Sequence, residues 1–147
     1  MEISLLADNP QESKVIARWY YDEWASIAPD MTIGQIQEKV AKAINRDQVP
    51  LIVLAHQNNE LVGVAELKFR ENKNHPEYEH WLDGLFVTPD YRGQGISNLL
   101  IKKSKSMPFV WALNAYICSA KSIMLHFIRS MASMFFTRPI IAKSKWL

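Results

Sequence analysis

The hydrophobic positions at the start of the chain indicate a short strand followed by a helix. Residues 2–7 form an apolar run that suits a strand, and Asn9-Pro10 then supplies a cap and a proline at the first helical position. Apolar residues recur after this point at spacings of three and four, which predicts a helix to about Ala28 with one stripe packed in the core. The stripe consists of Val15, Ile16, Trp19, Tyr20, Trp24 and Ile27.

A second helix and a strand hairpin follow. Thr32 and Gln35 have the spacing of a capping box, and the apolar period after them predicts a helix that ends at residues 45–48. Its expected buried face consists of Ile33, Ile36, Val40, Ala43 and Ile44. Residues 50–55 and 61–69 are apolar, β-branched runs on either side of a polar turn, so they are predicted to pair as a hairpin.

The remaining pattern completes a mixed order of elements. Residues 81–87 (WLDGLFV) predict another strand, residues 88–95 a turn-rich loop, and a helix is expected from Ile96 to about Lys103. The order is strand, helix, helix, strand, strand, strand, loop, helix, without an internal repeat or a linker. This order predicts a single α/β (α+β) domain over residues 1–147, with a mixed central sheet flanked by helices.

Composition narrows the class of protein. The chain has 147 residues, of which 48% are hydrophobic and 22% charged, so one globular domain can bury a core without disulfide bonds or a structural metal. The single Cys118 excludes a disulfide framework and a cysteine-based zinc site, and the spacing of His75, His80 and His126 is not that of metal ligands, so no metal is predicted. An acidic N-terminus and no long apolar run predict a cytoplasmic protein without a membrane span.

The charges are divided unevenly along the chain. Residues 1–90 hold all 15 acidic residues and 8 of the 17 basic ones, whereas residues 91–147 hold 9 basic residues and no acidic one. A basic segment can bind nucleic acid or anionic lipid, but such segments are usually polar, and this one is rich in Met, Phe and Trp. We therefore expect neither a nucleic-acid partner nor a membrane partner, while an interaction protein that uses this tail stays an alternative.

The segment at residues 87–97 (VTPDYRGQGIS) has the composition of an anion-binding loop between a strand and a helix. Gly93 and Gly95 allow main-chain N–H groups to approach a phosphate closely, and the helix that follows presents unpaired N–H groups. A dinucleotide-binding fingerprint would need a glycine where Asn98 stands and a later acidic residue, both of which are absent. The P-loop pattern is also absent.

The same segment resembles the acetyl-CoA signature of the GNAT acetyltransferases, V-x-P-x-[YF]-R-G-x-G-[IL]. Residues 18–24 (RWYYDEW), the strand VGVAEL and Trp81-Leu82-Asp83 extend the likeness over residues 1 to about 103. The resemblance implies a sheet splayed in its middle, acetyl-CoA as co-substrate, and an amine-bearing acceptor, either a small molecule or a peptide. It implies that the pyrophosphate is held by Arg92, Gly93, Gln94, Gly95, Ile96 and Ser97, and that backbone groups of Leu85, Phe86 and Val87 bind the pantetheine.

Direct transfer of an acetyl group to an amine, as this resemblance implies, requires a base rather than a nucleophilic side chain. The acceptor ammonium must lose a proton although its ordinary pKa lies well above 7. Carboxylates on the central strands are the natural candidates, so Asp83 and Glu66 are predicted as catalytic residues. From strict strand alternation, Asp83 is expected on the same face as Trp81 and Leu85.

The C-terminal part, residues 104–147, departs from the family pattern. From residue 107 onward it has no acidic residue, little alternation of period two, and four of the six Met. We hypothesise a change of reading frame near residues 103–107, because a shifted reading forces glycines at the Trp111-Ala112 and Met131-Ala132 steps, where the family has glycines. Tyr116 has no surroundings that match the family's tyrosine, which often protonates the departing thiolate. The alternative function is therefore a catalytically impaired, CoA-binding remnant.

Overall fold

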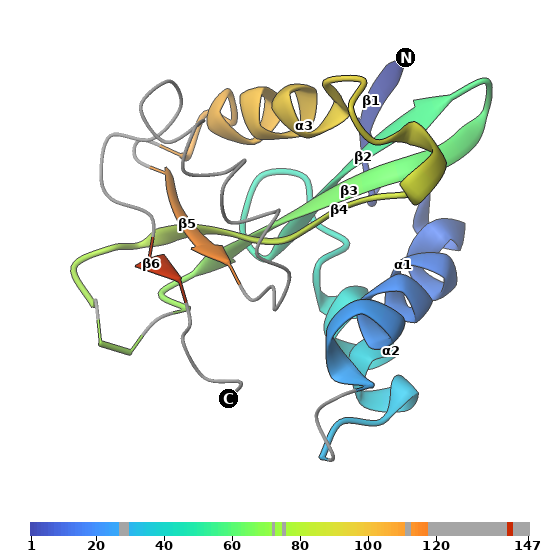
Figure 1. Ribbon diagram of the computed structural model, residues 1–147. Coiled ribbons are helices and arrows are strands. Elements are labelled where there is room, and N and C mark those ends of the chain that lie inside the picture. Colours follow the sequence, from blue (N-terminus) through green and yellow to red (C-terminus); the bar gives the residue numbers. More distant parts are fainter. Residues whose placement is uncertain (27–29, 72, 75, 111–112, 118–140, 143–147) are drawn as a thin grey trace.

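The computed structural model describes residues 1–26, 30–71, 73–74, 76–110, 113–117 and 141–142 and arranges them as a mixed sheet with helices on both faces (Figure 1). The strands are β1 (Glu2–Leu5), β2 (Leu51–Gln57), β3 (Glu60–Phe69), β4 (His80–Val87), β5 (Leu113–Ile117) and β6 (Ile141–Ala142). The helices are α1 (Ser13–Tyr20), α2 (Ile33–Lys42) and α3 (Ile96–Lys105). Neighbouring strands are antiparallel from β1 to β4 and parallel from β4 to β6, which confirms the predicted mixed α/β class.

The first predicted helix consists of three consecutive segments, which are a 3₁₀ turn, the α-helix α1 and a π-helical turn. A 3₁₀ turn at Pro10–Glu12 leads into α1, and a π-helical turn follows at Tyr21–Ala25, where the Ser26 N–H donates to the Tyr21 carbonyl at 2.7 Å. π-Helical turns inside helices are rare overall, and those that occur often lie at functional sites. The predicted end of this helix, at about Ala28, lies outside the described residues.

The second helix begins where its capping box predicts. The Thr32 hydroxyl oxygen accepts from the Gln35 N–H at 3.3 Å, and the Gln35 side-chain oxygen accepts from the Thr32 N–H at 2.8 Å. Ile36, Val40 and Ala43 are buried as expected. Ile44 is exposed, because α2 ends at Lys42 and the helical period no longer applies beyond Ala43.

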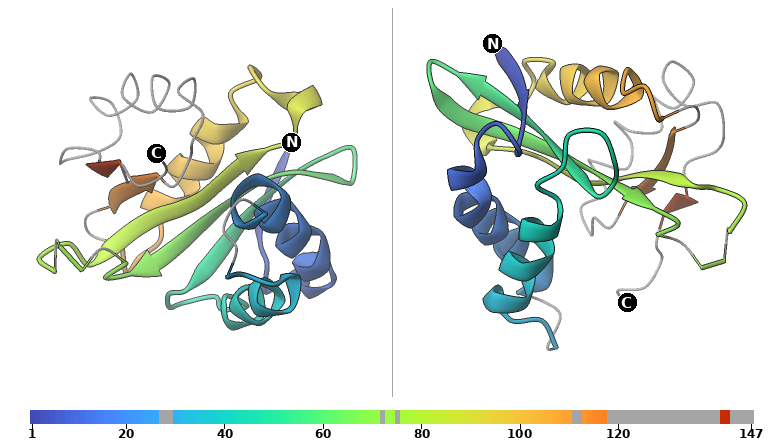
Figure 2. Two further views of the ribbon diagram at one scale, coloured as in Figure 1. Left: turned by 60° about the horizontal axis from the view of Figure 1, so that its bottom comes forward. Right: turned by 180° about the vertical axis from the view of Figure 1, so that it is seen from behind.

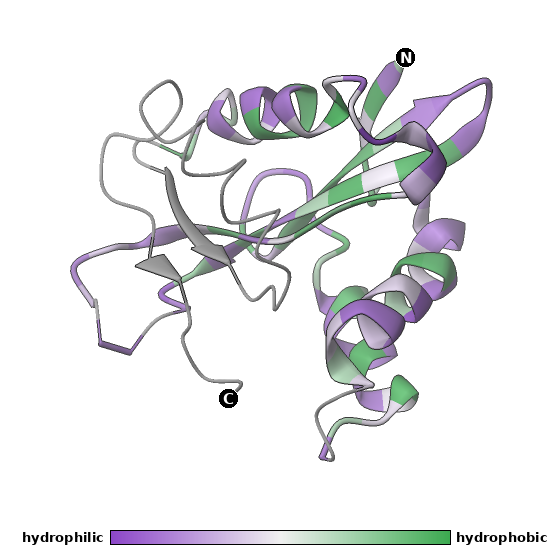
Figure 3. Cartoon of the chain, viewed as in Figure 1, coloured by the Kyte–Doolittle hydropathy of each residue, from purple (hydrophilic) through white to green (hydrophobic). Residues whose placement is uncertain are grey.

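The predicted hairpin of β2 and β3 is confirmed. Asn58 and Asn59 both have positive φ angles, 53° and 63°, which suits a two-residue hairpin turn whose twist matches that of the strands. Figure 3 shows this turn and the connection between β3 and β4 as hydrophilic, whereas the middle of both strands is hydrophobic. The hydrophobic middle therefore lies between the helices, and the polar ends project beyond them.

Helices lie on the two faces of the sheet (Figure 2), and a hydrophobic cluster packs on each face. On the α3 face, Ile96, Leu100 and Ile101 belong to one cluster with inward residues of the strands. On the other face, α1 and α2 contribute a second cluster, which includes Phe86 of β4. Alternate residues of β2 divide between the two clusters, as the period of a strand requires.

A bulge in β4 changes which of its residues share a face. Val64 of β3 pairs with Phe86, but Glu66 pairs with Asp83, so two steps along β3 match three along β4. Gly84 lies within the bulge and has a φ of +56°. The expectation that Asp83 and Leu85 share a face is therefore wrong: Leu85 packs in the α3-side cluster, while Asp83 lies beside Glu66 on the side of α1 and α2.

The expectation of no strand pattern in the tail is wrong for residues 113–117. This segment forms β5, which runs parallel to β4 with His80 opposite Leu113 and Leu82 opposite Ala115. Its sequence, LNAYI, alternates apolar and larger or polar residues over five positions, a signal too short to stand out from the sequence around it. Most of the proposed out-of-frame segment lies outside the described residues.

Candidate active site

The central sheet opens between β4 and β5. Their pairing ends at Leu82 opposite Ala115, while β4 continues to Val87 with only β3 beside it among the described strands. The Thr88 N–H donates to the Val62 carbonyl of β3 at 3.0 Å, so by alternation the Val87 N–H and C=O point away from β3. By the same alternation the backbone groups of Phe86 point toward Val64 of β3, so the second half of β4 presents backbone groups of Val87, but not those of Phe86, to the opening.

The loop before α3 has the backbone conformation of an anion cradle. Gly93 and Gly95 have φ angles of +78° and +80°, and a Cβ at either position would meet nothing within 4 Å. Asn98 and Leu99 donate to the Gly95 carbonyl at 3.1 and 3.3 Å. The two preceding amides, at Ile96 and Ser97, belong to the first helical turn, where N–H groups lack intrahelical partners. The loop residues therefore fit a diphosphate group.

Arg92 turns back onto β4. Its Nε donates to the Val87 carbonyl at 2.9 Å, and its guanidinium carbon lies 5.7 Å from the centre of the Phe86 ring. Gln94 also turns toward its own loop, where its side-chain nitrogen lies 3.5 Å from the Asp90 carbonyl oxygen. The arginine thus braces the junction between β4 and the loop.

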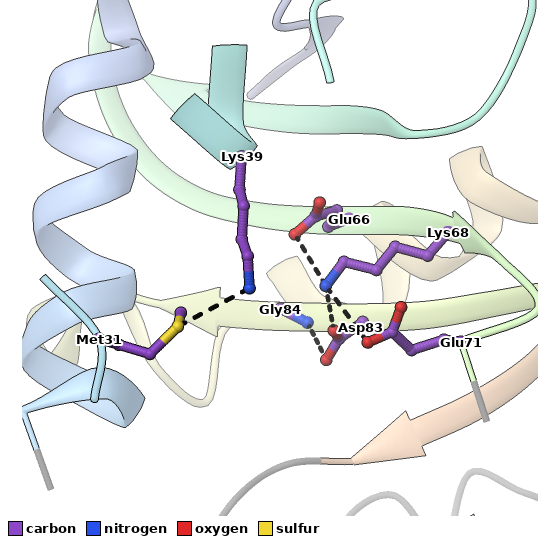
Figure 4. Close-up of polar contacts among 7 residues, drawn as sticks. All are labelled: Met31, Lys39, Glu66, Lys68, Glu71, Asp83 and Gly84. Carbon is purple, nitrogen blue, oxygen red and sulfur yellow. Dashed lines mark hydrogen bonds and ion pairs between the residues drawn. The ribbon is translucent and has the colours of Figure 1, made fainter. Parts of the chain in front are cut away.

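Glu66 and Asp83 are paired across β3 and β4, and both carboxylates face the ammonium group of Lys68 (Figure 4). The Lys68 Nζ lies 2.7 Å from Asp83 Oδ2, 3.9 Å from Glu66 Oε2 and 3.8 Å from Glu71 Oε1. Asp83 Oδ1 also accepts from the Gly84 N–H at 2.9 Å. Three carboxylates thus face one lysine at the point where β4 leaves β5.

Burial sets the protonation of this cluster. Glu66 is only 6% exposed, and burial raises its pKa to about 7, with Lys68 opposing the rise and Asp83 adding to it. Burial alone would lower the pKa of Lys68, but the carboxylates, Asp83 foremost, outweigh it and raise that pKa above its ordinary value. Lys39 of α2, whose Nζ lies 3.8 Å from the Met31 sulfur (Figure 4), also lowers the pKa of Glu66. Near neutral pH, Glu66 is consequently poised to gain or lose a proton.

Sequence reasoning missed three residues of this site, which are Tyr20, Gly84 and Lys68. Tyr20, expected only as core packing, places its hydroxyl against Gly84. An isolated glycine within a strand pattern is a signal for a bulge, and Lys68 stands two residues from Glu66, which is the spacing of one strand face. Both signals were present in the sequence. The contact between Tyr20 and Gly84 joins distant segments and leaves no local trace.

Neither a metal site nor a membrane span is found in the part of the chain that the structure describes. No group of three or more His, Cys, Asp or Glu side chains there is arranged to hold a metal ion. None of the helices described has both the length and the apolar character needed to cross a bilayer.

Comparison with known proteins identifies the class. Residues 13–118 match the model of the Acetyltransferase (GNAT) family, and the chain belongs to that family. The match continues beyond α3 and through β5. No curated protein sequence matches the chain.

Solved structures share the fold at low sequence identity. The aminoglycoside N-acetyltransferase AAC(6')-Iy in complex with CoA has a TM-score of 0.66 and 14% identity, covering 99% of this chain and 95% of its own. The enzyme AAC(6')-IG from Acinetobacter haemolyticus has a TM-score of 0.63 and 18% identity, with coverages of 100% and 99%. The acetyltransferase meta-AAC0020 from an uncultured soil metagenomic sample has a TM-score of 0.65 and 19% identity, with coverages of 99% and 95%. These likenesses establish the GNAT fold.

Proposed function

We propose that this protein transfers the acetyl group of acetyl-CoA to a primary amine of a cationic small molecule. One observation carries the proposal: a buried carboxyl group with a pKa of about 7, Glu66, is paired with Asp83 at the opening between β4 and β5. Structural neighbours support the choice of acceptor, since they include aminoglycoside acetyltransferases, one of them in complex with sisomicin. Aminoglycosides carry several amines, which agrees with the acidic cluster here.

Glu66 acts as the base in this proposal. A general base works best when its pKa lies near the operating pH, and proton transfer by such a group contributes about 10²- to 10⁴-fold to a rate. The acceptor ammonium gives one proton to Glu66, and its nitrogen then forms a bond to the acetyl carbon. The carbon–sulfur bond breaks, the sulfur leaves with the electron pair, and the second proton that the acylated nitrogen loses passes to the sulfur, so that the products are an amide and CoA in its thiol form. Asp83, held by Lys68 and Gly84, orients the amine.

The co-substrate binds, in this proposal, along β4 and the loop after it. Acetyl-CoA supplies an acetyl group that is activated as a thioester. Its pyrophosphate is held by Arg92, Gly93, Gln94, Gly95, Ile96 and Ser97, and its pantetheine by the backbone groups of Leu85 and Val87, which alternate with those of Phe86 along β4. The fit is supported by the open space at both glycines and by the N-terminus of α3, where a nearby negative group gains about 0.3–1 kcal/mol.

Thermal unfolding with and without acetyl-CoA tests the cofactor loop. Acetyl-CoA at about 100 times its Kd should add about 2.7 kcal/mol to the stability of a binding-competent chain. Gly95→Glu places a carboxylate in the cradle and should abolish this shift. Gly34→Glu is the matched control, because Gly34 is exposed in the first turn of α2 and has only Thr32 Oγ1 within reach, at 3.8 Å.

The outcomes separate the enzyme from a remnant. Stabilisation by acetyl-CoA, together with release of CoA in the presence of sisomicin, supports the transferase. Stabilisation without release of CoA across a panel of amines favours the CoA-binding remnant. Equal stabilisation of wild type and Gly95→Glu refutes the assignment of the loop.

We further propose that residues 1–147 form one N-acetyltransferase-like domain whose C-terminal part is altered by a change of reading frame. The nucleotide sequence around codon 104 tests this proposal. Close relatives that carry the same tail in one intact frame would contradict it.

A further inference from the structure

The Tyr20 side chain ends in a buried hydroxyl group without a hydrogen-bond partner in the part of the chain that the structure describes. The residue is 7% exposed and belongs to the last turn of α1, directly before the π-helical turn. A buried hydroxyl without a partner costs folding free energy, because it has lost its hydrogen bonds to water. A phenylalanine would fill the same space without this cost, so the hydroxyl is not explained by packing.

The fold makes room for this hydroxyl at the bulge of β4. A Cβ at Gly84 would lie 2.6 Å from the Tyr20 Oη and 2.8 Å from its Cζ, and real Cβ atoms do not approach other atoms so closely. Only glycine therefore allows the hydroxyl to reach the backbone of β4 beside Asp83. The positive φ of Gly84 imposes the same requirement independently.

Glu66 and Asp83 lie close enough to this hydroxyl to affect its ionisation. Burial raises the pKa of Tyr20 well above its ordinary value, and the charges of Glu66 and Asp83 raise it further. The hydroxyl consequently stays protonated and neutral, with oxygen lone pairs free to accept. Among the residues that the structure describes, the polar contact that Glu66 makes is with Lys68 at 3.9 Å, which is longer than a hydrogen bond, so the Glu66 oxygens also retain acceptor capacity.

We propose, on the basis of the function proposed above, that Tyr20, Glu66 and Asp83 form a subsite for the primary ammonium group of the acceptor. A primary ammonium has three N–H groups, and this subsite offers three acceptors: two carboxylates and the phenol oxygen. When one proton passes to Glu66, the two remaining N–H groups stay bound to Asp83 and Tyr20. Tyr20 thereby helps to position the ammonium group before proton transfer, and it favours primary amines over more substituted amines, which have fewer N–H groups to donate.

Binding of a minimal cation tests the subsite without acetyl-CoA. The probe is methylammonium chloride, and the readout is the backbone amide resonance of Gly84 in the full-length ¹⁵N-labelled protein. Tetramethylammonium chloride controls for ionic strength, since it has the same charge but no N–H group. Wild type should show a saturable shift with methylammonium only, and Tyr20→Phe should weaken that affinity about tenfold.

Stability supplies the second measurement. Tyr20→Phe removes an unpartnered buried hydroxyl and should raise Tm by roughly 3 °C or more. Tyr21→Phe is the matched control on the adjacent residue, whose ring lies under Arg18 at 5.8 Å, and it should change neither Tm nor methylammonium affinity. A rise in Tm combined with weaker binding is the signature of a hydroxyl retained for ligand contact.

Three results would overturn the subsite. These are a Gly84 resonance that does not respond to methylammonium, equal affinity in wild type and Tyr20→Phe, and a lower Tm for Tyr20→Phe, which would assign the hydroxyl a structural bond. Failure of the proposed acetyltransferase function gives a different set of results from failure of the ammonium subsite. In that case methylammonium binds as expected, but acetyl-CoA neither stabilises the chain nor releases CoA.

Discussion

The substitution Glu66→Gln tests how the buried carboxyl group couples stability to pH. Glu66 has a folded-state pKa of about 7 against an ordinary value of 4.5. The folded chain therefore holds a proton that the unfolded chain releases between these values, so stability falls as pH rises from about 4.5 to about 7. With about 1.36 kcal/mol for each pKa unit, the ionised group lowers stability by about 3 kcal/mol above pH 7.

Glutamine keeps the size of Glu66 and cannot ionise. At pH 5, where Glu66 is protonated in the folded chain, Glu66→Gln should have nearly the stability of wild type. At pH 8 it should be more stable by up to about 3 kcal/mol, since the burial cost of the charge is gone. Under the proposed function the same variant should lose about 10²- to 10⁴-fold in kcat, together with the rise of kcat/KM through pH 7.

Urea unfolding at pH 5 and pH 8 measures the stability effect, and CoA release across the same range measures the activity. Glu38→Gln, an exposed glutamate on α2, is the control for changing one charge without burial. The reasoning fails if Glu66→Gln destabilises the chain equally at both pH values. It also fails if the stability of wild type does not fall between them.

Two further substitutions probe the surroundings of Glu66. Gly84→Ala should lower stability by about 1–3 kcal/mol, since its Cβ would overlap Tyr20 at 2.6 Å and the φ of Gly84 is +56°. Gly34→Ala, on an exposed helix, should instead raise stability by about 0.5–1 kcal/mol. Urea unfolding compares the two variants, and stability changes of the same sign would contradict this interpretation. Lys68→Met removes the charge that lowers the pKa of Glu66, so the rising limb of the pH profile of kcat/KM should move to higher pH. If the limb does not move, the ionisation of Glu66 is not what the limb reports.

Local rules in the sequence predicted the parts of the fold that depend on neighbouring residues. The Thr32 capping box, the hairpin turn and the left-handed glycines of the loop before α3 each need only a few consecutive positions. The face of Asp83 was mispredicted because Gly84 was counted as an ordinary strand residue. When Gly84 is left out of the alternation, the observed faces are recovered.

The electrostatic properties of the site depend on contacts between segments far apart in the sequence. Glu66 was selected because it is a carboxylate on a central strand, but its pKa follows from how completely the neighbouring elements cover it. The 2.7 Å contact between Lys68 and Asp83 depends on the register of β3 and β4, which the bulge shifts. Such quantities require the packed structure.

The opening between β4 and β5 has a consequence for diffusion. The carboxylates lie on the side of α1 and α2, whereas the loop with Gly93 and Gly95 leads into α3 on the other face. Under the proposed reaction, a cationic acceptor and an anionic co-substrate approach β4 along separate routes, each attracted by charges or dipoles of opposite sign. This arrangement predicts that acceptor and co-substrate can bind in either order and that added salt slows both encounters.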